Sequence, residues 1–233
     1  MAIDTTFVFS YLLYCIIALF VFFICMKIYK TTSGASLAYK KWAQGTFIMF
    51  LGCFAYFLGG ILFECNNKTS TNANELCAII GETAVAFGYF YIPVGVMHLS
   101  KDLKVGKLNE QRIKKIQIVF FSAIVSIASL FLCLFSFFEI LIHIGVTFNL
   151  LHSIIWLFAI YSYNNVYSNV LKDMNTCWAY LYSGMITGLI SEIFSVFMYI
   201  IPQMLYLVIT FQLVMAASLI KGFYKLAKMV NAI

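Results

Sequence analysis

Residues 7–29 read FVFSYLLYCIIALFVFFICMKIY, a run in which Lys27 alone carries a charge. A helix crosses the roughly 30 Å hydrocarbon core of a bilayer with about 20 apolar residues, each adding about 1.5 Å. This run is long and apolar enough to do so, and it predicts a transmembrane helix. We expect the helix to be retained rather than cleaved as a signal peptide, because its basic residues follow the apolar run instead of preceding it.

The rest of the chain repeats this pattern. Of its 233 residues, 63% are hydrophobic, 18% aromatic and only 10% charged, whereas a soluble domain carries about 25% charged residues. A soluble fold cannot bury such an excess of apolar surface. The composition therefore excludes a soluble globular protein, a disordered chain, a coiled coil and a nucleic-acid-binding protein.

We predict an all-α integral membrane protein in which residues 1–233 form a single domain. A transmembrane β-barrel would show alternating segments of about ten residues, and the sequence has none. Close joints are expected at Glu139 and Pro202, where two pairs of apolar runs meet. The seven predicted spans are Phe7–Tyr29, Gly45–Phe63, Leu76–Leu99, Ile116–Phe138, Ile140–Tyr161, Ala179–Ile201 and Gln203–Gly222.

The basic residues predict the orientation of these spans. Lys68 is the only one of the 15 Lys and Arg residues that falls in a link on the side of the N-terminus. Because basic loops stay in the cytoplasm, the N-terminus is expected outside and the C-terminus inside. The outer link between the second and third spans holds a glycosylation sequon at Asn67. Cys65 and Cys77 flank that sequon and are candidates for a disulfide, the alternative being two free thiols.

Small residues recur at helical spacing within several spans. Gly45, Gly52 and Gly59 lie seven residues apart, as do three glycines of the next span. Such stripes let helices pack closely in lipid, and we predict packing faces there and at Ser122, Ser126 and Ser129. The spacing from Trp42 to Gly52 recurs from Trp178 to Gly188, which favours a 3+1+3 parallel repeat. The three evenly spaced glycines of the third span, mentioned above, are Gly81, Gly88 and Gly95.

Ionisable residues at membrane depth are costly and indicate function by default. Four ionisable side chains and two amide side chains fall mostly in the outer half of the third, fifth, sixth and seventh spans. They would line one ligand- or proton-binding pocket if those helices converge. The alternative is a structural role, in which each carboxyl group is protonated and hydrogen-bonded. A metal site is disfavoured, because the two histidines of the fifth span lie nine residues apart on opposite faces, and no cofactor is expected. The candidate residues are Glu82, Glu192, His152, Asn149, Gln212 and His143.

Two resemblances follow from the cytoplasmic turn after the first span. Residues 32–36, TSGAS, with Lys41-Trp42, Gly45 and Gly52, resemble archaeal and bacterial seven-helix membrane domains of the kind found in sensor proteins. The 3+1+3 layout and residues 27–33, KIYKTTS, resemble SWEET and PQ-loop transporters. The Pro-Gln pair of that family is missing from this turn, and Pro202-Gln203 lies on the other side.

The polar residues at membrane depth and the scarcity of proline hinges favour a multi-pass plasma-membrane protein of sensor, receptor-like or accessory-subunit type, not an enzyme, and the sensor resemblance implies the same class. It would bind a small ligand or a proton and signal through its basic cytoplasmic links to a separate partner, with the lipid bilayer as its environment. The alternative is a secondary transporter or proton-coupled carrier of a small solute. The glycine faces leave open whether the chain forms oligomers.

Overall fold

The computed structural model describes residues 5–32, 36–65, 72–102, 109–134, 141–167 and 175–229. Within these ranges the chain forms seven α-helices and no strand, and each helix is long and apolar enough to cross a membrane. This confirms the predicted all-α class and the number of spans. In chain order the helices are α1 (Thr5–Thr31), α2 (Leu37–Cys65), α3 (Asn72–Asp102), α4 (Glu110–Leu134), α5 (Leu141–Tyr167), α6 (Asn175–Met198) and α7 (Met204–Met229).

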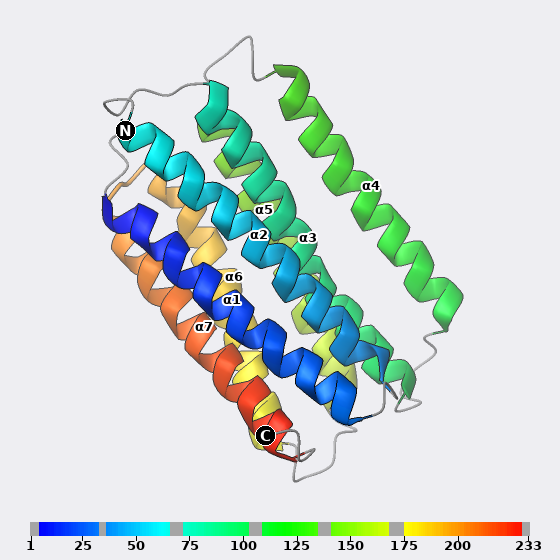
Figure 1. Ribbon diagram of the computed structural model, residues 1–233. Coiled ribbons are helices and arrows are strands. Elements are labelled where there is room, and N and C mark those ends of the chain that lie inside the picture. The colour runs from blue at the N-terminus through cyan, green and yellow to red at the C-terminus, as the bar shows by residue number, and fades with distance from the viewer. Residues whose placement is uncertain are drawn as a thin grey trace.

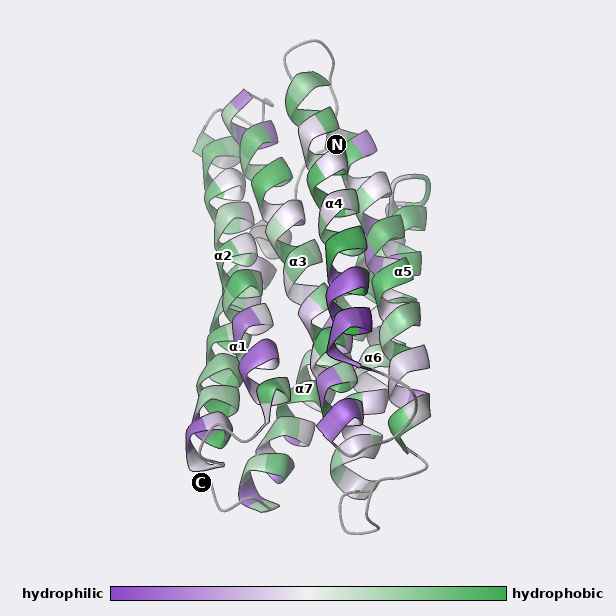
Figure 2. Cartoon of the chain, turned by 90° about the vertical axis from the view of Figure 1, so that its right-hand side faces the viewer, coloured by the Kyte–Doolittle hydropathy of each residue, from purple (hydrophilic) through white to green (hydrophobic). Residues whose placement is uncertain are grey.

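Several helices extend beyond the apolar runs that predicted them. α2 begins eight residues before Gly45, because the Ser36 hydroxyl accepts a hydrogen bond from the Ala38 amide (3.3 Å) and caps the helix there. α4 begins at Glu110, because Asn109 caps it in the same way through the Arg112 amide (2.9 Å). Hydropathy therefore located the membrane portion of each helix but not its ends. Figure 2 shows the hydrophilic residues gathered at the start of α4.

The two predicted close joints have different outcomes. α6 ends at Met198 and α7 begins at Met204. In the turn between them, the Met204 amide donates to the Ile201 carbonyl oxygen at 3.0 Å, so the joint at Pro202 is confirmed as tight. The joint predicted at Glu139 lies outside the described residues.

Six helices form a closed ring in the order α1, α2, α3, α5, α6 and α7, with α7 packed back against α1. α4 lies outside this ring against α3, at the right-hand edge of Figure 1. Its buried positions are Ile113, Ile124, Ala128 and Phe131. The packing face predicted for α4 was wrong: Ser122, Ser126 and Ser129 are exposed, because they lie off the face that α4 buries.

The glycines of α2 and α3 bring these two helices into close backbone contact, as predicted. A methyl group added at Gly52 would lie 2.8 Å from the Gly81 carbonyl oxygen, and one at Gly45 would lie 2.8 Å from the Gly88 carbonyl oxygen. On α6, an added methyl group at Gly188 would meet the Trp156 ring at 2.8 Å. These positions admit no side chain, because the helix axes are closer than ordinary side-chain packing allows.

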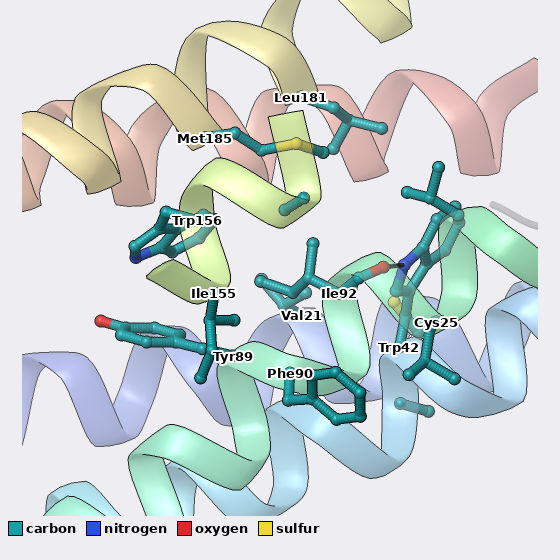
Figure 3. Packing of buried hydrophobic residues seen from close by; sticks show 14 of the residues in the cluster. Val21, Cys25, Trp42, Tyr89, Phe90, Ile92, Ile155, Trp156, Leu181 and Met185 are labelled. Atoms are coloured by element: carbon teal, nitrogen blue, oxygen red, sulfur yellow. Dashed lines mark hydrogen bonds between the residues drawn. The ribbon is translucent and has the colours of Figure 1, made fainter. Parts of the chain in front are cut away.

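A tryptophan joins α2 to α3 at the other end of the same interface. The Trp42 indole N–H donates to the Ile92 carbonyl oxygen at 3.0 Å, as Figure 3 shows. Gly95 leaves room for the ring, because a methyl group there would collide with the indole nitrogen. Phe223 of α7 packs against the same indole, edge to face at 5.4 Å between ring centroids. Trp42 thereby ties three helices together.

We expect Gly52→Ala to destabilise the protein by about 1–3 kcal/mol, the usual cost of overpacking. The added methyl group meets the Gly81 carbonyl and the Val85 amide nitrogen, and neither backbone atom moves easily. Unfolding in detergent, followed by circular dichroism, measures the change. Ala123→Val on the exposed side of α4 is the matched control, and equal stability of the two variants would contradict close packing at Gly52.

Candidate functional site

The six-helix ring encloses a cavity of about 130 Å³. One water molecule needs roughly 10–15 Å³ on this measure, so the cavity has room for several waters or a small organic molecule. It is elongated: on α2 its lining runs from Trp42 to Tyr56, about 21 Å of helical rise. The cavity therefore follows the bundle axis through much of the predicted membrane thickness.

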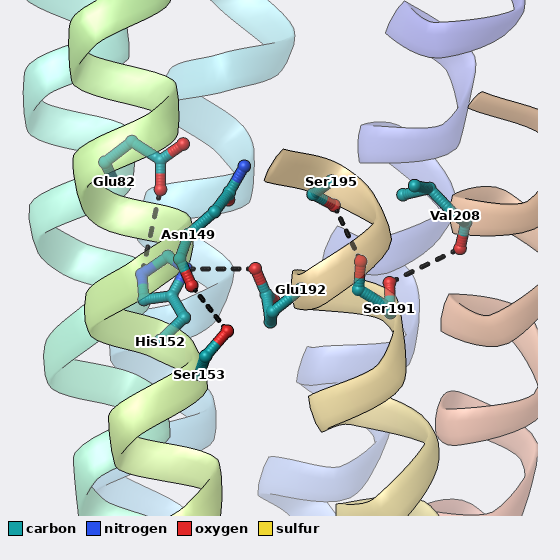
Figure 4. Close-up of polar contacts among 8 residues, drawn as sticks. All are labelled: Glu82, Asn149, His152, Ser153, Ser191, Glu192, Ser195 and Val208. Atoms are coloured by element: carbon teal, nitrogen blue, oxygen red, sulfur yellow. Dashed lines mark hydrogen bonds and ion pairs between the residues drawn. The ribbon is translucent and has the colours of Figure 1, made fainter. Parts of the chain in front are cut away.

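Two carboxyl groups and one imidazole form a polar cluster in the wall of this cavity (Figure 4). His152 of α5 lies between Glu82 of α3 and Glu192 of α6. Its Nδ1 is 3.5 Å from a Glu192 carboxyl oxygen, and its Nε2 is 3.7 Å from a Glu82 carboxyl oxygen. The three residues are only 2–9% exposed. One imidazole therefore links three helices.

Further polar side chains line the cavity around this cluster. The Tyr14 hydroxyl of α1 donates to the Gln212 side-chain oxygen of α7 at 2.7 Å. The Asn149 amide lies one turn from His152 and makes no hydrogen bond within the described part of the chain. The His152 Nε2 likewise makes no hydrogen bond there. The Asn149 amide is thus available to a ligand, whereas the His152 Nε2 has only its longer contact with Glu82.

The polar and apolar linings occupy different ends of the cavity. Glu82 lies in the first half of α3, His152 just before the middle of α5 and Glu192 in the second half of α6. Because successive helices along the chain alternate in direction, these positions lie in the half of the bundle in which α1 begins. Five tyrosines line the cavity with them: Tyr11, Tyr14, Tyr56, Tyr89 and Tyr199. The opposite end is lined by Val21, Trp42, Ile92, Met215, Leu219 and Phe223.

The structure brings together five of the six predicted site residues. Glu82, Asn149, His152, Glu192 and Gln212 all line the cavity. The prediction of His143 was wrong, since its side chain is exposed on the outside of α5. Nine residues separate it from His152, which is about two and a half turns and places it on the opposite face.

The loop candidates stand apart from the cavity. Cys65 and Cys77 are both free thiols in the structure, so the predicted disulfide is not formed in it. Cys77 packs against Gly59, six residues and about 9 Å of helical rise from Cys65. That separation exceeds what a disulfide spans. The sequon residue Asn67 lies outside the described residues.

Sequence reasoning missed the aromatic lining of the site. Tyr11 stacks on Tyr56 with 4.6 Å between centroids, and Tyr89 meets the His152 ring edge to face at 5.1 Å. A tyrosine hydroxyl within an apolar run signals a polar environment, since it seeks a partner when buried. Tyr14, with its bond to Gln212, is an example that the sequence offered.

The comparisons with known proteins give no match: no family model, no curated protein and no solved structure is similar to this chain. The class of protein is therefore defined by the fold and the site alone. The chain forms a bundle of seven apolar helices of the kind found in multi-pass membrane proteins, with a buried polar cavity at its centre. Among the described residues, no group of three or more His, Cys, Asp or Glu side chains is arranged to hold a metal ion.

We expect His152→Leu to destabilise the protein by about 3–5 kcal/mol, because it leaves two buried carboxyl groups without their shared partner. Adding Glu82→Gln and Glu192→Gln to this variant should recover part of the loss, since the amides carry no charge. Chemical unfolding of the single and triple variants measures both effects. A triple variant less stable than His152→Leu would contradict the pairing of the cluster.

Proposed function

We propose that this protein is a sensor-like or accessory membrane protein that binds a small ligand or a proton in the central cavity. The observation that carries this proposal is the Glu82–His152–Glu192 cluster, in which two carboxyl groups flank one imidazole at the wall of an enclosed cavity. Burying ionisable groups in an apolar bundle is costly. A ligand- or proton-binding function explains why these groups are present despite that cost.

The proposal includes an orientation, with the N-terminus outside and the C-terminus in the cytoplasm. The distribution of basic residues supports it. In this orientation the polar cluster lies in the outer half of the bundle and the apolar end of the cavity faces the cytoplasm. A ligand from outside would therefore meet the polar groups first.

The proposal also includes a 3+1+3 repeat. In the ring, α1, α2 and α3 neighbour one another in the same order as α5, α6 and α7, and α4 lies outside. The two closing contacts, α3 with α5 and α7 with α1, correspond to each other under a two-fold rotation. The cavity lies between the two halves.

In this proposal, the cytoplasmic links of the bundle pass the signal to a separate protein. Lys101 and Lys114 flank Glu110, with nitrogen–oxygen distances of 3.3 and 3.6 Å, where α3 gives way to α4. These side chains are 37–67% exposed, so the pairs contribute little to stability. They are available to a separate cytoplasmic or membrane protein.

A second candidate function is a secondary transporter or proton-coupled carrier. The specific observation that favours it is the position of the cavity inside the ring, between α1–α3 and α5–α7, since transporters built from repeats place their substrate sites at the interface between the repeats. The two functions differ in whether the ligand crosses the membrane.

Ligand binding is tested on protein in nanodiscs by thermal unfolding, against a library of small molecules of mixed charge and across pH 5 to 8. A ligand at a hundredfold excess over its Kd stabilises the folded state by about 2.7 kcal/mol. We expect stabilisation by at least one molecule or by a change of pH, and its loss in Glu192→Gln. Glu110→Gln is the matched control, because Glu110 is exposed and far from the cavity.

Two further measurements distinguish a carrier from a sensor or accessory protein. Solute or proton flux in liposomes that Glu192→Gln abolishes would favour the carrier. Co-purification of a partner without flux would favour the sensor or accessory role. Stabilisation by no molecule and at no pH would overturn the binding proposal.

The orientation is tested by thiol labelling in intact cells. Replacing Cys65 and Cys133 by serine removes two exposed thiols, and this background is the control. We expect Asn72→Cys to react with a membrane-impermeant maleimide directly, and Gln111→Cys only after permeabilisation, because these exposed positions begin α3 and α4 at opposite ends of the bundle. The reverse pattern would overturn the proposed orientation.

A further inference from the structure

Acidic groups outnumber basic groups in the wall of the cavity. Its lining contains two carboxyl groups, Glu82 and Glu192, and one imidazole, and no Lys or Arg is among the described residues of its wall. With both carboxyl groups ionised, even a protonated His152 leaves one negative charge uncompensated. Such a charge is costly in a buried site, and either a proton on one carboxyl group or a bound monovalent cation removes it.

The aromatic lining favours a cation at the same place. Five tyrosines line the cavity with the cluster, and two of them, Tyr11 and Tyr56, stack on each other beside it. The faces of aromatic rings attract cations, and cages of such rings recognise ammonium groups. Tyr11, Tyr56 and Tyr89 come from α1, α2 and α3, so three helices contribute aromatic rings to the wall of the cavity.

Uncommitted acceptors are also present. Asn149 is 8% exposed and lines the cavity, and its side-chain amide makes no hydrogen bond to the residues that the structure describes. Buried polar groups in proteins are nearly always hydrogen-bonded, so this amide calls for a partner. An ammonium group carries N–H donors that the Asn149 oxygen and the two carboxyl groups would accept.

The opposite end of the cavity indicates the rest of the ligand. It is lined by aliphatic, thioether and aromatic side chains, including Val21, Ile92 and Met215, and Trp42 with Phe223 closes it. A hydrated inorganic ion would leave this apolar end unused. A compact hydrocarbon or aromatic group would bury its surface there.

We propose that the cavity binds a small organic cation, a protonated amine that carries an apolar group, with its nitrogen on the cavity side of the Glu82–His152–Glu192 cluster and its apolar part toward Trp42. This inference rests on the proposed binding function and specifies the chemical class of the ligand. The anchoring groups come from α3 and α6, which belong to different halves of the ring.

Three probes of one shape test the inference: phenethylamine, which is a cation at pH 7, the neutral 2-phenylethanol, and the anion 3-phenylpropionate. Binding to protein in phosphatidylcholine nanodiscs is measured by calorimetry, with empty nanodiscs as the reference. We expect phenethylamine to bind at least about tenfold more tightly than the alcohol, because a charge-assisted hydrogen bond adds that much. The carboxylate should not bind.

Variants then locate the site. Glu82→Gln and Glu192→Gln should each weaken phenethylamine binding about tenfold or more and leave binding of the alcohol unchanged, since only the charge pairing is lost. Glu110→Gln should change neither. Should one of the site variants fail to fold, the selectivity of the unaltered protein among the three probes decides alone.

The outcomes separate this inference from the function on which it rests. Binding of the alcohol or the carboxylate as tightly as the amine, or binding of none of the three, would overturn the organic cation as the ligand class. The broader binding function would still stand if another molecule or a change of pH stabilised the protein. It would fail only if no molecule of any charge did so.

Discussion

The arrangement of this bundle depends on one buried imidazole that faces two carboxyl groups. His152 lies within 3.5–3.7 Å of an oxygen of both Glu192 and Glu82. In an apolar environment an unpaired carboxylate is far more costly than it is in water. α3, α5 and α6 must therefore hold these side chains together, which fixes the rotation of each helix about its axis. Apolar packing alone would allow many rotations, because the outer faces of these helices are apolar as well.

The small residues complement this constraint by setting distances between helices. Gly52 and Gly81 bring α2 within backbone contact of α3, while Gly188 admits the Trp156 ring between α5 and α6. Close contact at some interfaces leaves less material at the centre of the ring, where the cavity lies. The tyrosines and the polar cluster face this space at one end, and apolar side chains such as Val21, Ile92 and Met215 face it at the other. The positions of the glycines along the helices therefore determine where the cavity forms.

The sequence predicted the fold class, the seven spans and most of the site, and the failures share one cause. Glu82 and Glu192 were identifiable because a charge within an apolar run is conspicuous at any rotation of the helix. His143 and His152 were equally conspicuous, and their spacing showed that they lie on opposite faces. It did not show which face points inward, because apolar residues surround both. The exposed serines of α4 reflect the same ambiguity, since a small-residue stripe packs only where a neighbour is present.

The path from the polar cluster to the opposite end of the cavity runs along α3. Tyr89 packs against the His152 ring, and one turn further on the Ile92 carbonyl accepts the Trp42 hydrogen bond. Pro93 follows directly and has no N–H to donate to the Tyr89 carbonyl, so the ladder of helical hydrogen bonds is interrupted between the two contacts. One backbone hydrogen bond of α3 is therefore missing between the contact with His152 and the contact with Trp42. In the proposed function, a ligand that alters the Glu82–His152–Glu192 pairing would act through this segment on the contact of Trp42 with Phe223 of α7, and the basic end of α7 at Lys225 and Lys228 lies less than two turns beyond.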